Sequence, residues 1–257
     1  MGLVRVEGKR QAGLLVIVLV LLAIPGVMGL WTSQAARVPA PALWESEYEG
    51  LQSPDPKVRA QTVKQMSVTQ DSHAVPVLLL YLGDPDQKVG LYMAQTLGNL
   101  AEEDALAALR TALWDSNPNI RWRAAMALGE QRDAQAVPRL ARLLQDPEKL
   151  VQNVAANALA QIGSPEAIDA LAVGLGSAEP STVSNTMNGL QRLGSAAVPA
   201  LTSILKSSIP EARHNAATLL GYIADPQAGP ALQQAASDPD ADVRAEAQWA
   251  LGEIRKK

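Results

Sequence analysis

Cysteine is absent from this 257-residue sequence, and histidine occurs twice, as His73 and His214. The absence of cysteine excludes disulfide bonds, thiolate metal sites and cysteine nucleophiles. Nucleophilic catalysis also needs a base beside the nucleophile and a third group that orients the base. Two isolated histidines form no such arrangement, and the sequence has no glycine-rich phosphate-binding motif. We therefore expect no enzymatic activity and no bound metal or cofactor.

Phenylalanine is also absent, and aromatic residues make up 4% of a chain that is 47% hydrophobic. A core built mainly from alanine and leucine suits closely spaced helices better than a sandwich of sheets. The net charge is −4, and acidic residues outnumber basic ones after residue 37. Nucleic-acid-binding proteins carry a basic stripe instead, so we expect no nucleic-acid partner.

The sequence does contain a repeat of 30 or 31 residues that can be followed in two columns of apolar residues. The first column consists of Met66, Leu97, Leu128, Leu159, Leu190, Leu220 and Leu251. The second column consists of Leu78, Leu109, Leu140, Leu171, Leu201 and Leu232. Around each column, apolar residues follow a helical period, which predicts two short amphipathic helices for each repeat. Such a hairpin cannot bury both apolar stripes alone, so the repeats must stack.

Proline positions predict where these helices begin. Asp84-Pro85, Asp146-Pro147 and Asp238-Pro239 place an acceptor side chain beside a proline, which suits the N-cap and first position of a helix. Four further prolines are expected to start the second helices in the same way, namely Pro76, Pro138, Pro199 and Pro230. Six full hairpins are therefore expected over residues 53–236, followed by one capping helix over residues 240–254.

The N-terminal segment differs from the repeats. Arg5, Lys9 and Arg10 precede a stretch from Gly13 to Trp31 of 19 uncharged and mostly apolar residues. This length suits a membrane-spanning helix, and the preceding positive charges predict a cytoplasmic N-terminus with the repeats on the extracytoplasmic side. A cleaved signal peptide is the alternative, because Ser33-Gln34-Ala35 offers small residues for cleavage. The repeats would then be secreted or periplasmic.

These patterns divide the chain into three parts. Residues 1–36 are expected to form the transmembrane anchor or signal peptide, residues 37–52 a linker and an N-terminal cap, and residues 53–257 the repeats. The expected cap residues are Leu43, Trp44, Tyr48 and Leu51. A cap is expected because the first layer of a repeat protein needs a cover.

Two segments show a family resemblance, residues 119–129 (NIRWRAAMALG) and residues 242–254 (DVRAEAQWALGEI). They resemble the short HEAT-like repeat first associated with phycobilin lyase subunits, and the resemblance covers roughly residues 53–254. It implies an all-α fold, a right-handed α-solenoid of helix-turn-helix repeats. The same repeat serves scaffolds, lyase subunits and a di-iron hydroxylase, so the fold does not determine function. The hydroxylase uses His-Glu pairs to bind iron, and this chain has no His-Glu dipeptide.

The family's arginine after the first apolar position of each repeat is kept at Arg59, Arg121, Arg213 and Arg244. It is replaced by Gly90, Gln152 and Val183. We call these seven residues the ladder positions. The three replacements predict that a continuous ladder of arginines between repeats is broken.

By resemblance, second helices line the concave side of the solenoid, and a protein partner is expected there. Arg110, Arg139 and Arg142 interrupt an otherwise small-residue surface and together are candidates to hold an acidic group of the partner. The simpler alternative is that they are ordinary solvated charges. Trp122 stands in a column of mostly small or polar residues, so it is a candidate exposed anchor, with Trp114 packed against it. A purely structural role for this pair is the alternative.

Asparagines gather on the first helices of the fourth to sixth repeats, where they are poor helix formers. They are expected to form hydrogen bonds either between layers or to a partner: Asn153, Asn157, Asn185, Asn188 and Asn215.

The sequence therefore predicts a membrane-tethered or exported interaction scaffold that binds a protein on its concave face. The alternative is a lyase-like accessory subunit that presents a bilin chromophore to a client protein.

Overall fold

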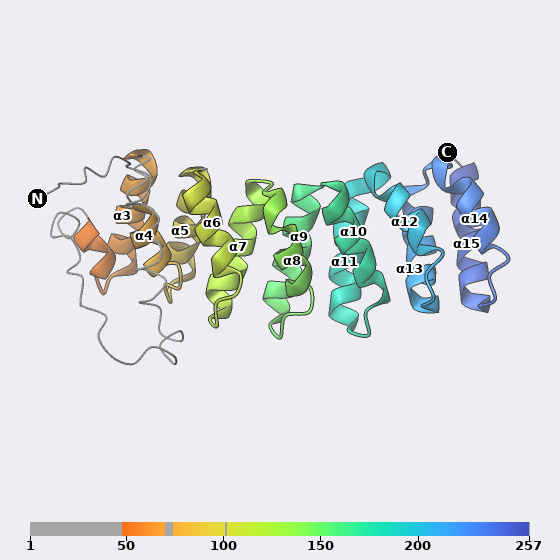
Figure 1. Ribbon diagram of the computed structural model, residues 1–257, viewed down its shortest axis with the longest axis horizontal. Coiled ribbons are helices and arrows are strands. Elements are labelled where there is room, and N and C mark those ends of the chain that lie inside the picture. Colours follow the sequence, from red (N-terminus) through yellow and green to blue (C-terminus); the bar gives the residue numbers. More distant parts are fainter. Residues whose placement is uncertain (1–47, 70–73, 101, 257) are drawn as a thin grey trace, which may run out of the picture. The chain divides into compact units, whose positions relative to one another are not determined.

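The computed structural model describes residues 48–69, 74–100 and 102–256, and within them it contains helices and no strand. The chain forms two compact units, residues 1–127 and residues 128–257. The first helices of the repeats, labelled as in Figure 1, are α3 (Pro56–Thr69), α5 (Gln87–Leu100), α7 (Pro118–Glu130), α9 (Lys149–Ile162), α11 (Pro180–Leu193), α13 (Pro210–Ile223) and α15 (Ala241–Arg255). The second helices are α4 (Val75–Leu80), α6 (Glu103–Ala112), α8 (Val137–Leu143), α10 (Pro165–Val173), α12 (Val198–Ile204) and α14 (Gly229–Ala235).

Short 3₁₀ turns join several of these helices. They are η1 (Glu49–Gln52), η3 (Ala134–Ala136), η4 (Gly174–Gly176), η5 (Gly194–Ala197) and η6 (Pro226–Ala228).

In the first unit, α3 packs against α5, and α4 packs against both α5 and α6. The turn η1 packs on α3, and its Leu51 is buried. The expected cap residues Leu43 and Trp44 lie outside the described residues, so the N-terminal cap stays a prediction. The first unit thus stacks first helices on first helices and second helices on second helices.

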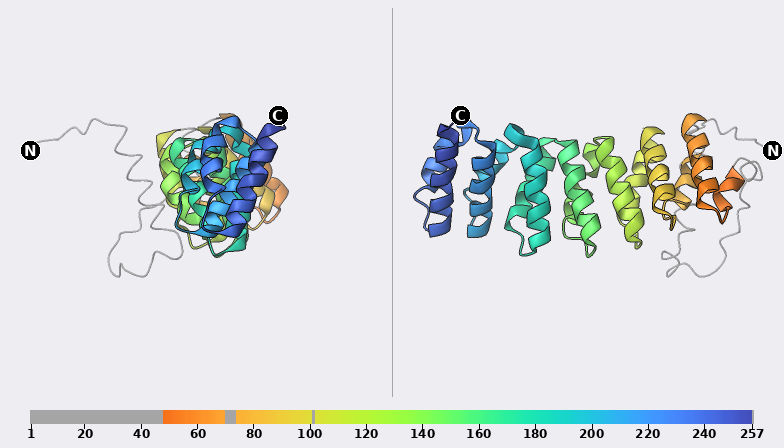
Figure 2. Two further views of the ribbon diagram at one scale, coloured as in Figure 1. Left: turned by 90° about the vertical axis from the view of Figure 1, so that its right-hand side faces the viewer. Right: turned by 180° about the vertical axis from the view of Figure 1, so that it is seen from behind.

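The second unit repeats this arrangement. α9, α11, α13 and α15 follow one another as packed first helices, and α8, α10 and α12 follow one another as packed second helices. The two blue helices α13 and α15 lie side by side in Figure 1 and in the rear view of Figure 2. The predicted all-α repeat fold is therefore confirmed within each unit.

The two apolar columns form the core. Every second-column leucine has no exposed surface, and first-column residues from Met66 to Leu220 are buried. Leu251 is half-buried because α15 lacks a following layer among the described residues. Alanines fill the space between helices, as the composition predicts.

The predicted helix starts need one correction. Asp84, Asp146 and Asp238 do not cap the first helices, because those helices begin three residues later at Gln87, Lys149 and Ala241. The N-cap side chains are instead Asp86 and Asp240, which accept hydrogen bonds from the backbone amides of the second and third residues of α5 and α15. Prolines do stand at the start of the second helices α4, α8, α12 and α14, as predicted.

The predicted anchor or signal peptide at residues 1–36 lies outside the described residues. Among the described helices, none combines the length and apolar character that a membrane crossing requires.

Candidate functional site

Each loop that precedes a first helix has the same local geometry. A side-chain oxygen accepts the backbone N–H two residues later, which turns the chain into the helix. This hydrogen bond is 2.7–3.2 Å long in seven loops, and the accepting residues are Ser53, Asp84, Asp115, Asp146, Ser177, Ser207 and Asp238. We call these residues the loop positions.

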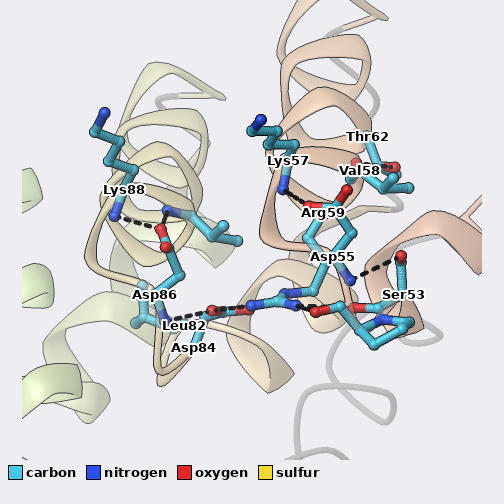
Figure 3. A network of polar contacts seen from close by, with 12 residues as sticks. Ser53, Asp55, Lys57, Val58, Arg59, Thr62, Leu82, Asp84, Asp86 and Lys88 are labelled. Carbon is cyan, nitrogen blue, oxygen red and sulfur yellow. Dashed lines mark hydrogen bonds and ion pairs between the residues drawn. The ribbon is translucent and has the colours of Figure 1, made fainter.

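An arginine at a ladder position ties its loop to the helix. Arg59 on α3 donates through Nη1 to the carbonyl of Ser53 at 2.8 Å. Its Nε and Nη2 donate to both carboxylate oxygens of Asp84 at 2.7 and 2.9 Å, as Figure 3 shows. One guanidinium therefore joins its own loop to the loop of the following repeat.

Arg213 in the second unit makes the same contacts. Its Nη1 donates to the carbonyl of Ser207 at 2.9 Å, and its Nε and Nη2 hold both oxygens of Asp238 at 2.8 and 2.7 Å. The side chains of this pair are 10% and 8% exposed. The hydrogen bond from Arg213 lowers the pKa of Asp238 below its ordinary value.

Three other ladder positions also supply a donor to the carbonyl six residues earlier. Arg121 donates to the carbonyl of Asp115 at 2.8 Å, and Arg244 donates to that of Asp238 at 2.7 Å. Gln152 replaces arginine but its amide Nε2 reaches the carbonyl of Asp146 at 2.7 Å. A glutamine therefore keeps this one contact without carrying the charge.

The space beside Gly90 is occupied by a side chain from another helix. Arg123, on α7, lies so close that a Cβ added to Gly90 would stand 2.1 Å from the guanidinium carbon. Arg123 donates to the carbonyls of Asp84 and Leu82 at 3.0 and 2.7 Å. The carbonyl of Asp84 is the one that a residue at position 90 would reach. The missing arginine is thus replaced by one 33 residues further along the chain.

This substitute arginine is deeply buried. Its side chain is 1% exposed, it stands 5.1 Å from the ring of Trp122, and burial lowers the pKa of Arg123. The nearby carboxylates of Asp84 and Asp86 oppose this shift. Arg123 therefore completes the polar contacts of this loop at the cost of a buried charge.

Val183, the remaining replacement, cannot donate a hydrogen bond. A groove of about 440 Å³ opens beside it in the second unit, between α11 and α13. Ser177 and Ala178 form its loop end, Met187 lines its α11 wall, and Glu211 lines its α13 wall. The groove thus lies at the ladder position that no donor occupies.

The chemistry of the groove is mixed. Val183, Met187 and Leu219 supply apolar surface, and Asn188 and Gln191 supply amides that both donate and accept hydrogen bonds. Glu211 is its single charged lining residue among the described residues. This combination suits a polypeptide segment, whose backbone presents both N–H and C=O groups.

An aromatic pair continues the surface beyond the groove. Tyr222, which also lines the groove, is 60% exposed and meets Trp249 of α15 edge to face, with the ring centroids 5.3 Å apart. Gly221 makes this possible, because a Cβ there would stand 2.3 Å from the Trp249 ring. Exposed aromatic residues that are held by packing often act as anchors in interfaces.

The arginines that the sequence singled out lie in different environments. Arg110 on α6 is buried and donates to Glu103 at 2.7 Å, and the same contact lowers the pKa of Glu103. In the second unit, Arg139 is half-buried and Arg142 is exposed, both on α8. Arg110 thus pairs within its own helix, and Arg139 and Arg142 place two positive charges on α8.

The interpretation of Trp122 as an exposed anchor is wrong. Its side chain is 6% exposed, and its indole N–H donates to Asn119 at 3.1 Å. Trp122 packs beside the guanidinium of Arg123, which replaces the ladder arginine missing at Gly90. Its role is therefore structural. Trp114, in contrast, is 51% exposed.

The asparagine cluster makes contacts between layers. Asn215 of α13 donates to the carbonyl of Leu175 in η4, and Asn157 of α9 accepts from Arg192 of α11. Asn188 is exposed in the groove. The sequence analysis identified Val183 as a break in the ladder but did not connect it with Glu211, because Glu211 lies on a different helix, α13.

No group of three or more His, Asp or Glu side chains in the described part of the chain is arranged to hold a metal ion. His73 lies outside that part, and His214 lies on α13.

Comparisons with known proteins agree with this fold. The karyopherin Kap121p, solved bound to the extreme C-terminus of the protein phosphatase Cdc14p, is similar with a TM-score of 0.56 and 13% identity. That match covers 86% of this chain and 30% of Kap121p. At this identity the likeness shows the helical-repeat fold alone.

Two solved enzymes or enzyme subunits are also similar. Human deoxyhypusine hydroxylase has a TM-score of 0.38 and 24% identity over 82% of this chain and 84% of its own. The CpcE–CpcF complex of the Nostoc phycocyanin lyase has a TM-score of 0.42 and 19% identity over 88% of this chain and 99% of its own. These values say nothing about activity, so the lyase-like alternative stays a prediction.

No curated protein sequence matches the chain significantly. The HEAT-repeat family matches residues 48–120, 110–191 and 198–257, which together span nearly all of the described residues. Since these matches coincide with the stacked helices of both units, the chain belongs to the HEAT-repeat family.

Proposed function

We propose that this chain is a protein-interaction scaffold whose second unit binds a segment of a partner protein in the groove between α11 and α13. The groove beside Val183 is the observation that carries this proposal. It combines apolar side chains with amides, and the exposed Tyr222–Trp249 pair extends it. Tyrosine and tryptophan give large contact areas at low conformational-entropy cost, and amides adapt to either partner of a hydrogen bond.

The surface formed by the second helices is another candidate binding face, which the sequence predicts to be the concave side. Arg139 and Arg142 of α8 would there attract an acidic segment by charge. The exposed side chains of α12, such as Ser203, belong to this surface. Kap121p bound to a peptide terminus is a precedent for segment binding on this fold.

Site-specific photocrosslinking in the native host distinguishes these two faces. A photoreactive phenylalanine derivative replaces Met187 in the groove, Ser203 on α12, or Val68 of α3, which is 83% exposed and serves as the control position. We expect Met187 to crosslink to one defined segment of one partner protein, identified by mass spectrometry.

Crosslinking from Ser203 without crosslinking from Met187 would assign binding to the second helices instead. Equal labelling from all three positions, or none from the second unit, would contradict the scaffold proposal. Changing Arg142 to glutamine in the Ser203 photoprobe tests whether charge is what brings the partner to that face.

We also propose that the scaffold acts on the extracytoplasmic side of a membrane, either tethered by residues 13–31 or released after Ala35. The charge-free N-terminal stretch supports this. Intact mass and membrane fractionation from the native host test the proposal. Full-length mass in membranes indicates a tether, a chain beginning near Ala36 indicates cleavage, and a full-length cytosolic chain contradicts both.

A further inference from the structure

Six of the seven loop carbonyls in the described chain receive a side-chain donor. Arg59, Arg121, Gln152, Arg213 and Arg244 each supply one from their own repeat, and Arg123 supplies the sixth in place of Gly90. The seventh carbonyl belongs to Ser177, six residues before Val183. In the described residues no side chain donates to it.

The loop at Ser177 is nevertheless built like the loops that do receive a donor. Ser177 has φ −68° and ψ 142°, and Ser53 has φ −60° and ψ 138°. Each serine hydroxyl accepts the backbone N–H two residues later at 3.2 Å. Because ψ sets the direction of the carbonyl, the Ser177 oxygen points as the Ser53 oxygen does toward Arg59.

The chain itself shows that a donor for this position can come from elsewhere. Gly90 leaves space for a guanidinium, and Arg123 occupies that space from α7 and reaches the carbonyl of Asp84. At Val183, Asn215 of α13 reaches the carbonyl of Leu175, but no described side chain donates to the carbonyl of Ser177. Ser177, Val183 and Asn215 all line the groove.

The charges around the groove favour a cation at this end. Glu211 lines the α13 wall, and Glu179 follows the loop as the N-cap of α11. The basic residues nearby bind other groups. Arg213 pairs with Asp238, and Arg192 donates to Asn157. An incoming cation therefore meets the Glu211 carboxylate and a backbone acceptor inside the groove, and Glu179 adds a negative charge at the adjacent N-cap.

We propose that the groove takes an arginine side chain of the partner protein, whose guanidinium donates to the Ser177 carbonyl and to Glu211 and so completes the ladder in trans. This rests on the proposed function and specifies the partner segment as one that contains arginine between small or apolar residues. Arginine suits the site better than lysine, because its planar guanidinium donates in several fixed directions at once.

A pairwise isotope label reads the Ser177 carbonyl directly. The sequence contains two Ser-Ala pairs, Ser177–Ala178 and Ser195–Ala196. A full chain made by cell-free synthesis with ¹³C-carbonyl serine and ¹⁵N-alanine therefore gives two selected amide signals. Ala178 reports the groove, and Ala196, which lies in the turn η5, is the internal control.

The probes are acetylated and amidated pentapeptides of sequence Gly-Ser-X-Ser-Gly, in which X is arginine, lysine or citrulline. Citrulline has the shape of arginine without its charge. We expect the arginine peptide to shift the Ala178 signal in a saturable way and to leave Ala196 unchanged. We expect the citrulline peptide to bind at least about tenfold more weakly, the difference of one charge-assisted hydrogen bond.

A donor side chain placed at position 183 of the chain itself should block the proposed arginine-binding site. Val183→Arg is expected to abolish the shift, whereas Val183→Met, which adds similar bulk without a donor, is expected to retain it. Val183→Gln imitates Gln152 and serves as the second blocking variant if the arginine variant does not fold. Glu211→Gln is expected to weaken the arginine peptide at least about threefold and to leave the citrulline peptide unchanged.

Equal binding of arginine and citrulline peptides, or undiminished binding to both blocking variants, would overturn the proposal. If the peptides do not bind while Met187 crosslinks to a partner, the arginine assignment fails and the scaffold function stands. If they bind with the expected pattern and Met187 crosslinks to nothing, the arginine site stands and the scaffold function fails.

Discussion

Two consecutive loops of the second unit differ in whether an arginine binds them to the next loop. Ser177 and Ser207 each precede a first helix, and each hydroxyl accepts a hydrogen bond from the backbone N–H two residues later. The carbonyl of Ser207 accepts a hydrogen bond from Arg213, which also pairs with Asp238. The ladder position of the Ser177 loop is Val183, which has no side-chain donor. We call the first arrangement, Ser207–Arg213–Asp238, the closed junction. We call the second, Ser177–Val183–Ser207, the open junction, and it borders the groove.

The comparison also explains why the open junction is tolerated. Where Arg213 has Asp238 as its partner in the next loop, Val183 has Ser207 at the equivalent position. Losing an arginine while keeping the aspartate would leave a nearly buried carboxylate unpaired, which is costly. Here both charged groups are absent together, so the junction carries no unpaired charge and its surface remains available for binding.

Removing the guanidinium from the closed junction should have the largest effect. Arg213→Met leaves Asp238 nearly buried without its partner, and we expect the free energy of unfolding to fall by about 3 kcal/mol. Urea denaturation of the full chain measures this. Arg192→Met on exposed α11 surface is the matched control and should cost less than about 0.5 kcal/mol. Similar losses in both variants would contradict the distinction between the junctions.

The junction completed from another helix should be the next most sensitive. In Gly90→Ala the new Cβ overlaps the guanidinium of Arg123, which must move away from the carbonyls of Leu82 and Asp84. We expect a loss of about 2 kcal/mol in denaturant unfolding. The double variant Gly90→Arg with Arg123→Met moves the donor back to its own repeat and should recover more than half of this loss. A neutral Gly90→Ala variant would show that Arg123 is not held there.

Acid should weaken the closed junction and not the open one. Because Arg213 lowers the pKa of Asp238, this carboxylate stabilises the folded chain above its unfolded pKa of about 4 and loses that contribution as pH falls through its lower folded pKa. Asp238→Ser copies the residue at Ser207. We expect the stability difference between wild type and this variant to be largest near pH 7 and to shrink below about pH 4. A constant difference across this range would refute the ionic account.

Closing the open junction should have the smallest effect on stability. Val183→Arg adds a donor to the Ser177 carbonyl but meets Ser207 instead of a carboxylate, so we expect a gain of about 0.5 kcal/mol. Adding Ser207→Asp should raise the total gain to about 1.5 kcal/mol, and a double-mutant cycle separates the coupling energy of the new pair from the effects of the two single changes. If Val183→Arg lowers stability and adding Ser207→Asp does not restore it, the groove cannot accommodate a ladder arginine.

Much of the fold was predictable because each repeat has the same spacing of apolar residues and helix-starting residues. The spacing of Leu78, Leu109 and Leu140 predicts one buried column, and each of these residues has no exposed surface. The helix starts were predicted less well, because Asp84-Pro85 fits an N-cap pattern equally well two residues too early. The partner-binding roles of Arg139, Arg142 and Trp114 stay predictions.

The sequence by itself determined the repeat, its helical faces and the places where the ladder departs from arginine, since each of these depends on residues within one repeat. Tertiary structure decided what each departure means. Gly90 and Val183 are equivalent breaks in the sequence, yet Gly90 is filled by Arg123 with Trp122 packed beside it, whereas Val183 borders a groove. The reason is that a missing side chain leaves a space whose occupant is set by neighbouring helices. Only their packing brings a distant guanidinium to one space and leaves the other open.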